Sequence, residues 1–129
     1  MLFRSYVASI GTNWFTAVEG AADTTPPTVA TTVPADAAIA VAITANVVWN
    51  FSEAILLSDV NATNFFVYAD ADNSVVAGAL SVNAAHTQVT FDPTANLTAA
   101  SKYWAAATGV RDMAGNAMAA PKMVSFTTA

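Results

Sequence analysis

The sequence predicts an all-β fold, an antiparallel β-sandwich of two packed sheets. Two observations lead to this prediction. From Thr28 onward, apolar residues recur with a period of two, which is typical of half-buried strands. About seven such runs follow one another, and turn residues separate them every 8–15 positions or so. The chain also lacks cysteine, so its core must form without a disulfide. Together these features are typical of an immunoglobulin-type sandwich.

The runs define the expected strands and core. The predicted strands are residues 28–33, 47–51, 65–68, 75–82, 88–91, 103–108 and 123–127. The segments 56–64 and 94–101 lack strand alternation, and we expect both to form helical turns. The expected core consists of large apolar side chains on the strands: Val47, Trp49, Phe51, Phe66, Val89, Phe91, Tyr103 and Phe126.

The chain before Thr28 predicts a different organisation. Apolar residues between Val7 and Val18 lie at i, i+3, i+7 and i+11, the spacing of one helical face, but Gly11 interrupts them. We therefore predict that residues 1–22 are a helical or extended remnant of a preceding domain. Residues 1–5 match one reading frame of a common sequencing adapter, so we interpret them as an artefact of a truncated read. Residues 23–27 contain two prolines and form a predicted stiff hinge, and residues 28–129 form the main domain.

Composition excludes several functions. The chain has 4 Lys and Arg against 9 Asp and Glu, a net charge of -5, which disfavours binding to nucleic-acid phosphates. One histidine and no cysteine exclude thiol catalysis and multi-histidine or cysteine metal sites. Hydrophobic residues make up 55%, but much of this is alanine. No run approaches the ~18–20 apolar residues of a membrane-spanning helix, so we expect no membrane insertion.

The segment Arg111–Asn116 is the most specific local motif. The Asp112 carboxylate is placed to accept hydrogen bonds from backbone N–H groups two or three residues ahead, and Gly115 and Asn116 tolerate positive φ. One interpretation is a structural loop. The alternative is a calcium site in which Asp23 joins Asp112 and Asn116, since calcium takes 6–8 oxygen ligands. The spacing does not match an EF-hand, so we expect no cofactor, with calcium as the alternative.

Other polar positions favour structural roles over catalysis. Glu53 follows the run 47–51 and is interpreted as a charged strand end rather than an acid or metal ligand. A glycosidase needs a second carboxylate at roughly 5–10 Å, and nothing in the sequence places Asp59 or Asp92 there. Asp70–Asn73 is interpreted as a hairpin turn, and His86 as a solvated loop residue. The sequence therefore predicts a protein without enzymatic activity.

An ordered series of motifs resembles a known family. The motifs are Asp23-Thr-Thr-Pro-Pro-Thr-Val29, Pro34-Ala-Asp36, Phe51-Ser-Glu53, Asn64-Phe65, Val89-Thr-Phe91-Asp-Pro93, Tyr103, Thr108-Gly-Val110, Asp112-Met-Ala-Gly-Asn116 and Ser125-Phe-Thr-Thr128. From about Asp23 to Ala129 the chain closely resembles the bacterial immunoglobulin-like domain of S-layer and other surface proteins. It departs from the pattern in two loops, at Ala37-Ala38 and at Ala54–Leu57. The resemblance implies a non-catalytic spacer, adhesive repeat or accessory module.

A second resemblance concerns Thr12–Val18, which looks like the final segment of phage and prophage major tail proteins. It implies an appended C-terminal domain displayed outside the tail. The alternatives are a repeat of a bacterial adhesin or S-layer protein, or an accessory module of a secreted hydrolase. The implied partners are neighbouring domains of a larger polypeptide and cell-surface polysaccharide. The implied location is extracellular, on a cell or virion surface.

Overall fold

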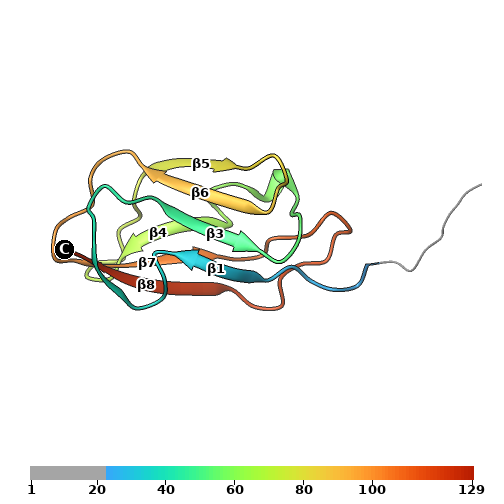
Figure 1. Ribbon diagram of the computed structural model, residues 1–129, viewed down its shortest axis with the longest axis horizontal. Helices are drawn as coiled ribbons and strands as arrows, with labels where there is room; N and C mark the ends of the chain where they lie inside the picture. Colours follow the sequence, from blue (N-terminus) through green and yellow to red (C-terminus); the bar gives the residue numbers. More distant parts are fainter. Residues whose placement is uncertain (1–22) are drawn as a thin grey trace, which may run out of the picture.

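Two four-stranded sheets pack face to face in the computed structural model, which describes residues 23–129 (Figure 1). The strands are β1 (Val29–Val33), β2 (Ala38–Val41), β3 (Val47–Phe51), β4 (Phe65–Ala69), β5 (Gly78–Val82), β6 (Gln88–Pro93), β7 (Lys102–Ala107) and β8 (Lys122–Thr128). One sheet has the order β1-β3-β6-β5 and the other β2-β8-β7-β4. The predicted sandwich is thus confirmed. The adapter match and the remnant in residues 1–22 lie outside the described residues.

The first two strands, β1 and β2, belong to different sheets. β1 pairs antiparallel with β3, whereas β2 pairs with β8 in parallel. Ala37 lies between them at φ 65, and its N–H donates to the Ser125 carbonyl at 2.7 Å. The sequence did not predict β2 as a separate strand, because its four residues have little alternation. This parallel pair departs from the otherwise antiparallel pattern.

Seven of the eight expected core residues are buried, and the expectation for Phe66 is wrong. The pleat of β4 directs Phe65 and Val67 inward and Phe66 and Tyr68 outward. The Phe65 ring lies 5.1 Å from that of Trp49, in an edge-on contact. Because Phe65 and Phe66 are adjacent, the alternation of the strand is consistent with either one facing the core. Phe66 and Tyr68 lie on the same face, so burying Phe66 would also bury the Tyr68 hydroxyl. The observed phase leaves that hydroxyl outside.

Alanine explains part of the high apolar content. Ala105, Ala106 and Ala107 of β7 are all buried.

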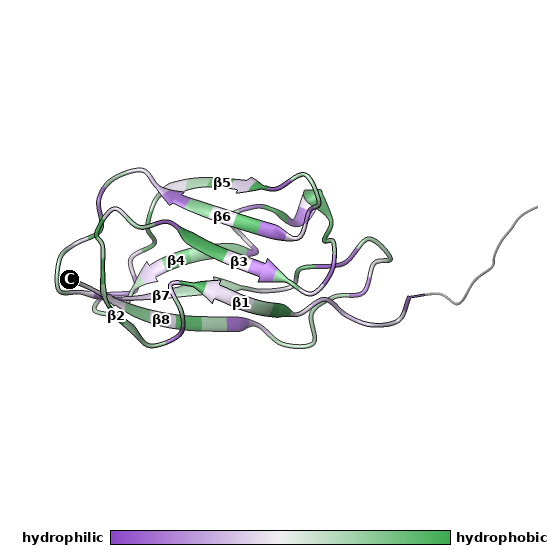
Figure 2. Ribbon diagram, viewed as in Figure 1, coloured by the Kyte–Doolittle hydropathy of each residue, from purple (hydrophilic) through white to green (hydrophobic). Residues whose placement is uncertain are grey.

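In Figure 2, β6 is apolar in its middle and hydrophilic at both ends, as expected for a strand whose centre crosses the core. Within residues 23–129, no helix has the length and apolar character needed to cross a membrane.

The two connecting segments have different structures. Residues 57–59 form a 3-10 turn, η2 (Leu57–Asp59), which confirms the expected helical turn there. The same expectation for 94–101 is wrong, because this segment is a loop with a single turn. Its Thr98 N–H donates to the Tyr103 hydroxyl oxygen at 2.9 Å, a contact known as a tyrosine corner in immunoglobulin-type sandwiches. Thr128 Oγ1 also donates to the Thr98 carbonyl at 2.6 Å. Contacts with β7 and β8 therefore replace the internal bonds of a helical turn.

Candidate functional site

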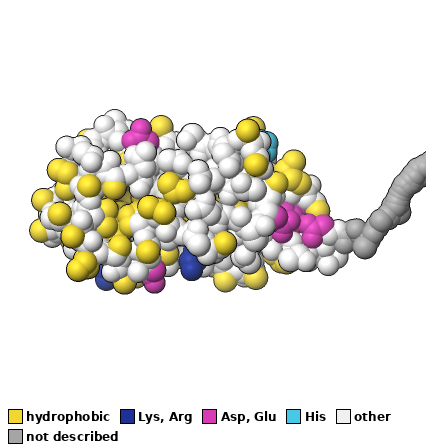
Figure 3. Space-filling model, in the orientation of Figure 1, with side chains coloured by type: hydrophobic (Ala, Val, Ile, Leu, Met, Phe, Trp, Pro, Cys, Tyr) yellow, Lys and Arg dark blue, Asp and Glu magenta, His cyan; other side chains and the backbone are white. Residues whose placement is uncertain are grey.

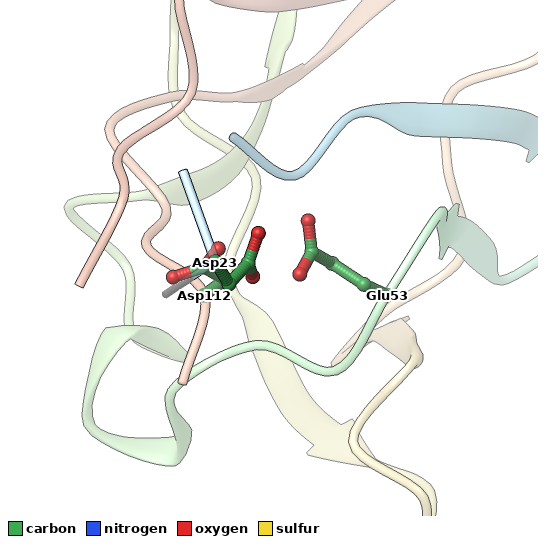
Figure 4. Close-up of side chains that lie close together, drawn as sticks. All are labelled: Asp23, Glu53 and Asp112. Carbon is green, nitrogen blue, oxygen red and sulfur yellow. The ribbon is translucent and has the colours of Figure 1, made fainter. Parts of the chain in front are cut away.

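Three acidic side chains meet at the end of the sandwich where the chain enters it. Asp23 precedes β1, Glu53 follows β3, and Asp112 lies between β7 and β8. Each offers a carboxylate oxygen, and these oxygens lie within 4.8 Å of one another. Figure 4 shows Glu53 extending toward Asp23 and Asp112. In Figure 3 acidic side chains gather at this end, while most of the visible face is uncharged. We call these three residues the acidic cluster.

Local hydrogen bonds fix Asp112. Its Oδ1 accepts from the backbone N–H of Ala114 at 2.9 Å and of Asn116 at 2.8 Å. Gly115 takes φ +93°, a conformation that favours glycine, and this lets the loop turn back toward Asp112. The expected carboxylate-capped loop is therefore present, with donors two and four residues ahead of Asp112.

A contact between remote segments brings Glu53 to this loop. Ile55 and Asp112 form an isolated antiparallel bridge, and the Leu56 N–H donates to the Arg111 carbonyl at 2.9 Å. The chain that leaves β3 therefore runs beside the 111–116 loop, with Glu53 two residues before the bridge. The sequence motif contains Asp112 but gives no signal for this pairing, and by sequence alone Glu53 has the pattern of an ordinary charged strand end.

Asn116 connects the loop to the incoming chain. Its Nδ2 donates to Asp112 Oδ2 and to the Asp23 carbonyl oxygen, both at 2.9 Å. The structure thus brings together Asp23, Asp112 and Asn116, the three residues considered for calcium. The Asn116 side chain presents its N–H to this group rather than an oxygen, so it orients the two acids, and Glu53 supplies the third carboxylate.

The carboxylates of the acidic cluster differ in acidity. Burial, followed by the neighbouring carboxylates of Asp23 and Asp112, raises the pKa of Glu53. Burial also opposes ionisation of Asp112, but the hydrogen bonds from Asn116, Asp23 and Ala114 together outweigh it and hold the pKa of Asp112 below its ordinary value. The cluster therefore concentrates negative charge that a cation would relieve.

The nearest cationic residue in sequence is engaged elsewhere. Arg111 Nη2 lies 2.8 Å from Asp59 Oδ1, and Arg111 Nε donates to Asp59 Oδ2 at 3.0 Å. The Arg111 backbone N–H also donates to Asp59 Oδ2, at 2.9 Å. These bonds to Arg111 lower the pKa of the Asp59 carboxyl, although burial opposes them. Sequence reasoning missed this pair because its members are 52 positions apart.

The three carboxylates of the acidic cluster could supply three of the 6–8 oxygen ligands of a calcium ion. Calcium binds oxygens at 2.3–2.6 Å, so two ligands of one ion lie at most about 5 Å apart. The 4.8 Å limit among the three carboxylates meets this condition. The donors are all oxygens, which is the ligand type that calcium prefers. Among residues 23–129 no other group of three metal-ligating side chains is this close.

The remaining polar candidates have structural surroundings. Asp72 Oδ1 accepts from the Ser74 hydroxyl at 2.7 Å and from its N–H at 3.0 Å, as in a turn. These bonds from Ser74 lower the pKa of Asp72. His86 lies in the turn before β6 at φ 59, and its N–H donates to the Asn83 carbonyl at 3.0 Å. Asp92 is an exposed residue of β6.

Comparisons with known proteins agree with this architecture. Domains 1–6 of the surface layer protein SbsC match with a TM-score of 0.60 and 16% identity, covering 78% of this chain and 13% of that one. PcoC, a methionine rich copper resistance protein from Escherichia coli, matches with a TM-score of 0.65 and 17% identity, covering 80% and 98%. CopC from Methylosinus trichosporium OB3b matches with a TM-score of 0.58 and 14% identity, covering 75% and 87%.

At these identities the structural likeness shows the fold alone. The chain spans only 13% of the SbsC chain that it matches. Comparison with curated protein sequences finds no match. A sequence model of the bacterial Ig-like domain, by contrast, matches residues 23–128. Because this match covers most of the chain, the protein belongs to the bacterial Ig-like domain family.

Proposed function

We propose that this domain is a non-catalytic module displayed on a surface as part of a longer polypeptide. The observation that carries the proposal is the placement of the chain ends. The chain enters at one end of the sandwich, and Ala129 lies at the opposite end (Figure 1). A module with opposed ends extends a polypeptide outward, which suits decoration, spacing or weak adhesion to a cell surface or polysaccharide.

Two parent proteins are consistent with such a module. The resemblance of Thr12–Val18 to the end of a phage major tail protein favours a domain appended outside a virion tail. The structural likeness to domains of the surface layer protein SbsC favours the alternative, a repeat of a bacterial surface protein. Antibodies raised against the purified chain distinguish them, because immunogold particles would decorate tails in the first case and cell envelopes in the second. Labelling of neither, in cells that express the protein, would refute surface display.

We further propose that the acidic cluster binds calcium and thereby fixes the incoming chain to the domain. Asp23 belongs to the incoming segment, whereas Glu53 and Asp112 belong to the sandwich. An ion shared by all three would join the two parts. Such a junction would stiffen the connection to whatever precedes residue 23, which is useful in a spacer.

Calcium titration of the full chain tests this second proposal. We expect calorimetric binding of one ion and an increase in melting temperature over the value in EDTA, because an ion that binds only the folded state stabilises it. Asp112→Asn and Glu53→Gln should abolish both effects. Asp92→Asn, which neutralises an exposed acid outside the cluster, should preserve them. Equal melting temperatures in calcium and EDTA would refute the proposal.

A further inference from the structure

The outer face of the β2-β8-β7-β4 sheet carries aromatic side chains that the core does not use. Phe66 and Tyr68 point outward from β4, and Trp104 points outward from β7. All three are half-buried. Tyr68 lies directly opposite Trp104 in the strand register, and the Phe66 and Tyr68 ring centroids are 6.2 Å apart. We call these three residues the aromatic face.

The strand register places this face between apolar and polar surroundings. On the apolar side, Phe66 is in register with Ala106, which is in register with Met123 of β8. On the polar side, Lys102 lies two residues before Trp104, opposite Thr127. Side chains two positions apart on a strand are separated by about 6–7 Å. The outer face therefore changes from apolar residues at one end to hydrogen-bonding groups at the other.

Two hollows share the turn between β4 and β5 in their lining, and the first of them includes two residues of the aromatic face. An aromatic hollow of about 360 Å³ is lined by Phe66, Tyr68, Asn73 and Val75. A polar hollow of about 470 Å³ has the following charged and hydroxyl groups in its lining: Asp70, Asp72, Ser74, Thr98, Ser101, Lys102 and Tyr103. A ligand that crosses the turn would meet ring faces on one side and hydroxyl, carboxylate and ammonium groups on the other.

Trp104 is held in position by two polar neighbours. Its Nε1 donates to Asp70 Oδ1 at 2.7 Å, and Lys102 Nζ lies 5.0 Å from the ring centroid. These contacts fix the indole before any ligand binds, which lowers the entropic cost of binding. Asp70 is therefore a positioning residue for the aromatic face as well as part of the polar hollow.

The charge of this region favours a neutral partner. The charged side chains that line the polar hollow are Asp70, Asp72 and Lys102, two acids and one base, with a net charge of -1. A net charge of -1 gives an anionic glycan, lipid or nucleic acid no electrostatic attraction to this hollow. The other nearby option, addition of a peptide strand to β4, is blocked. Val76 N–H donates to the Val67 carbonyl at 2.8 Å, and Ala69 N–H to the Ser74 carbonyl at 2.9 Å, so this edge is already paired.

We propose that the aromatic face binds a neutral polysaccharide. The C–H faces of pyranose rings would stack on Phe66 and Tyr68, as apolar surfaces do on aromatic rings. The sugar hydroxyls would reach the carboxylates and hydroxyls of the polar hollow. This inference rests on the proposed role in surface display and adhesion, to which it adds a ligand class and a binding site.

Calorimetric titration of the full chain with neutral hexasaccharides tests the inference. The probes are the oligomers of glucose, mannose, galactose and N-acetylglucosamine, each up to about 10 mM, and oligogalacturonate as the acidic comparator. We expect at least one neutral oligomer to bind and the acidic one to bind more weakly. Phe66→Ala and Tyr68→Ala should each weaken binding about tenfold, as for a central aromatic contact. Tyr68→Phe should retain most of the affinity because it keeps the ring.

Controls distinguish a loss of sugar binding from a loss of folding, and a failure of this inference from a failure of the proposed function. Val33→Ala removes an exposed apolar side chain from the other sheet and should leave binding unchanged, and melting curves verify that each variant folds. The inference is overturned if no neutral oligomer binds, if the acidic one binds best, or if the Phe66 and Tyr68 variants bind like the parent. Binding of isolated cell envelopes that persists in those variants would overturn the inference alone and leave surface adhesion intact. Absence of binding to both sugars and envelopes would also refute adhesion.

Discussion

Arg111 and Asp112 are adjacent in the chain, yet they occupy opposite electrostatic environments. Arg111 forms a bidentate pair with Asp59, whose side chain is only 7% exposed. Asp112 faces two further carboxylates, Asp23 and Glu53, within 4.8 Å. The first arrangement stabilises the folded chain by itself, whereas the second carries like-charge repulsion unless a cation is present. Partners from remote segments, rather than neighbours in sequence, determine the role of each charge.

Truncating Ile55, which lies between the two sites, should give the largest loss in the free energy of unfolding. Ile55 is completely buried, lies between Glu53 and Asp59 in the chain, and forms the bridge to Asp112. We expect Ile55→Ala to lower the free energy of unfolding by about 2–5 kcal/mol, because it leaves a cavity beneath both arrangements. Urea denaturation measures this loss. Ile39→Ala is the matched control, since Ile39 is 79% exposed and should change stability by less than about 0.5 kcal/mol. Equal losses in the two variants would contradict this assignment of the core.

Breaking the Arg111–Asp59 ion pair should give the next largest loss in the free energy of unfolding. Asp59→Asn removes the charge that accepts from the Arg111 side chain and backbone N–H. Leaving such donors without their partner costs about 1–3 kcal/mol, so we expect a destabilisation of that size by urea denaturation. Asp92→Asn, on an exposed position of β6, should be near neutral. A variant as stable as the parent would show that the ion pair contributes nothing to folding.

Acidification should affect the contributions of Asp59 and Glu53 to stability in opposite directions. The pKa of Asp59 is lowered in the folded chain, so its stabilisation is complete above the ordinary value of 3.8 and is lost as pH falls through the lower folded value. The pKa of Glu53 is raised, so folding gains stability as pH falls through that raised value toward 4.5. Without calcium, the free energy of unfolding should therefore rise slightly on mild acidification and fall below pH 3.8. Asp59→Asn should reduce the fall, and Glu53→Gln should remove the rise. A monotonic decrease from neutral pH in the parent and in Asp59→Asn, both of which keep Glu53, would contradict this interpretation.

The sequence predicted the parts of this region that depend on short-range bonds. The Asp112 loop was predictable because its carboxylate accepts from residues two and four positions ahead. The Glu53 contact and the Asp59 pair were not, because both depend on the Ile55–Asp112 bridge between segments that are far apart in the chain. The same limit explains the error at Phe66.

Two adjacent phenylalanines satisfy the alternation of a strand in either phase, and only the packing of Phe65 against Trp49 and Phe51 decides between them. The sequence-based expectation for 94–101 failed for a related reason. An alanine-rich segment has the propensity for a helical turn, but the Tyr103 hydroxyl and Thr128 hold it as a loop. Alternation therefore predicted the sheets, while contacts between remote strands determined which faces and loops carry the polar groups.

The smallest expected effect is the sharpest test of the difference between the two sites. In EDTA, Glu53→Gln should raise the melting temperature slightly, because it removes a carboxylate whose raised pKa reflects burial and repulsion from Asp23 and Asp112. In saturating calcium the sign should reverse, since the parent would gain stability from the ion and the variant would lose a ligand. Calorimetric melting of both proteins in both buffers measures the reversal. Asp59→Asn serves as the control, because it should lower the melting temperature equally in EDTA and in calcium. If the Glu53→Gln variant is less stable than the parent in EDTA, Glu53 stabilises the fold by contacts other than a bound cation. The acidic cluster would then stabilise the fold without an ion, as the Arg111–Asp59 pair does, and the contrast between the two sites would be wrong.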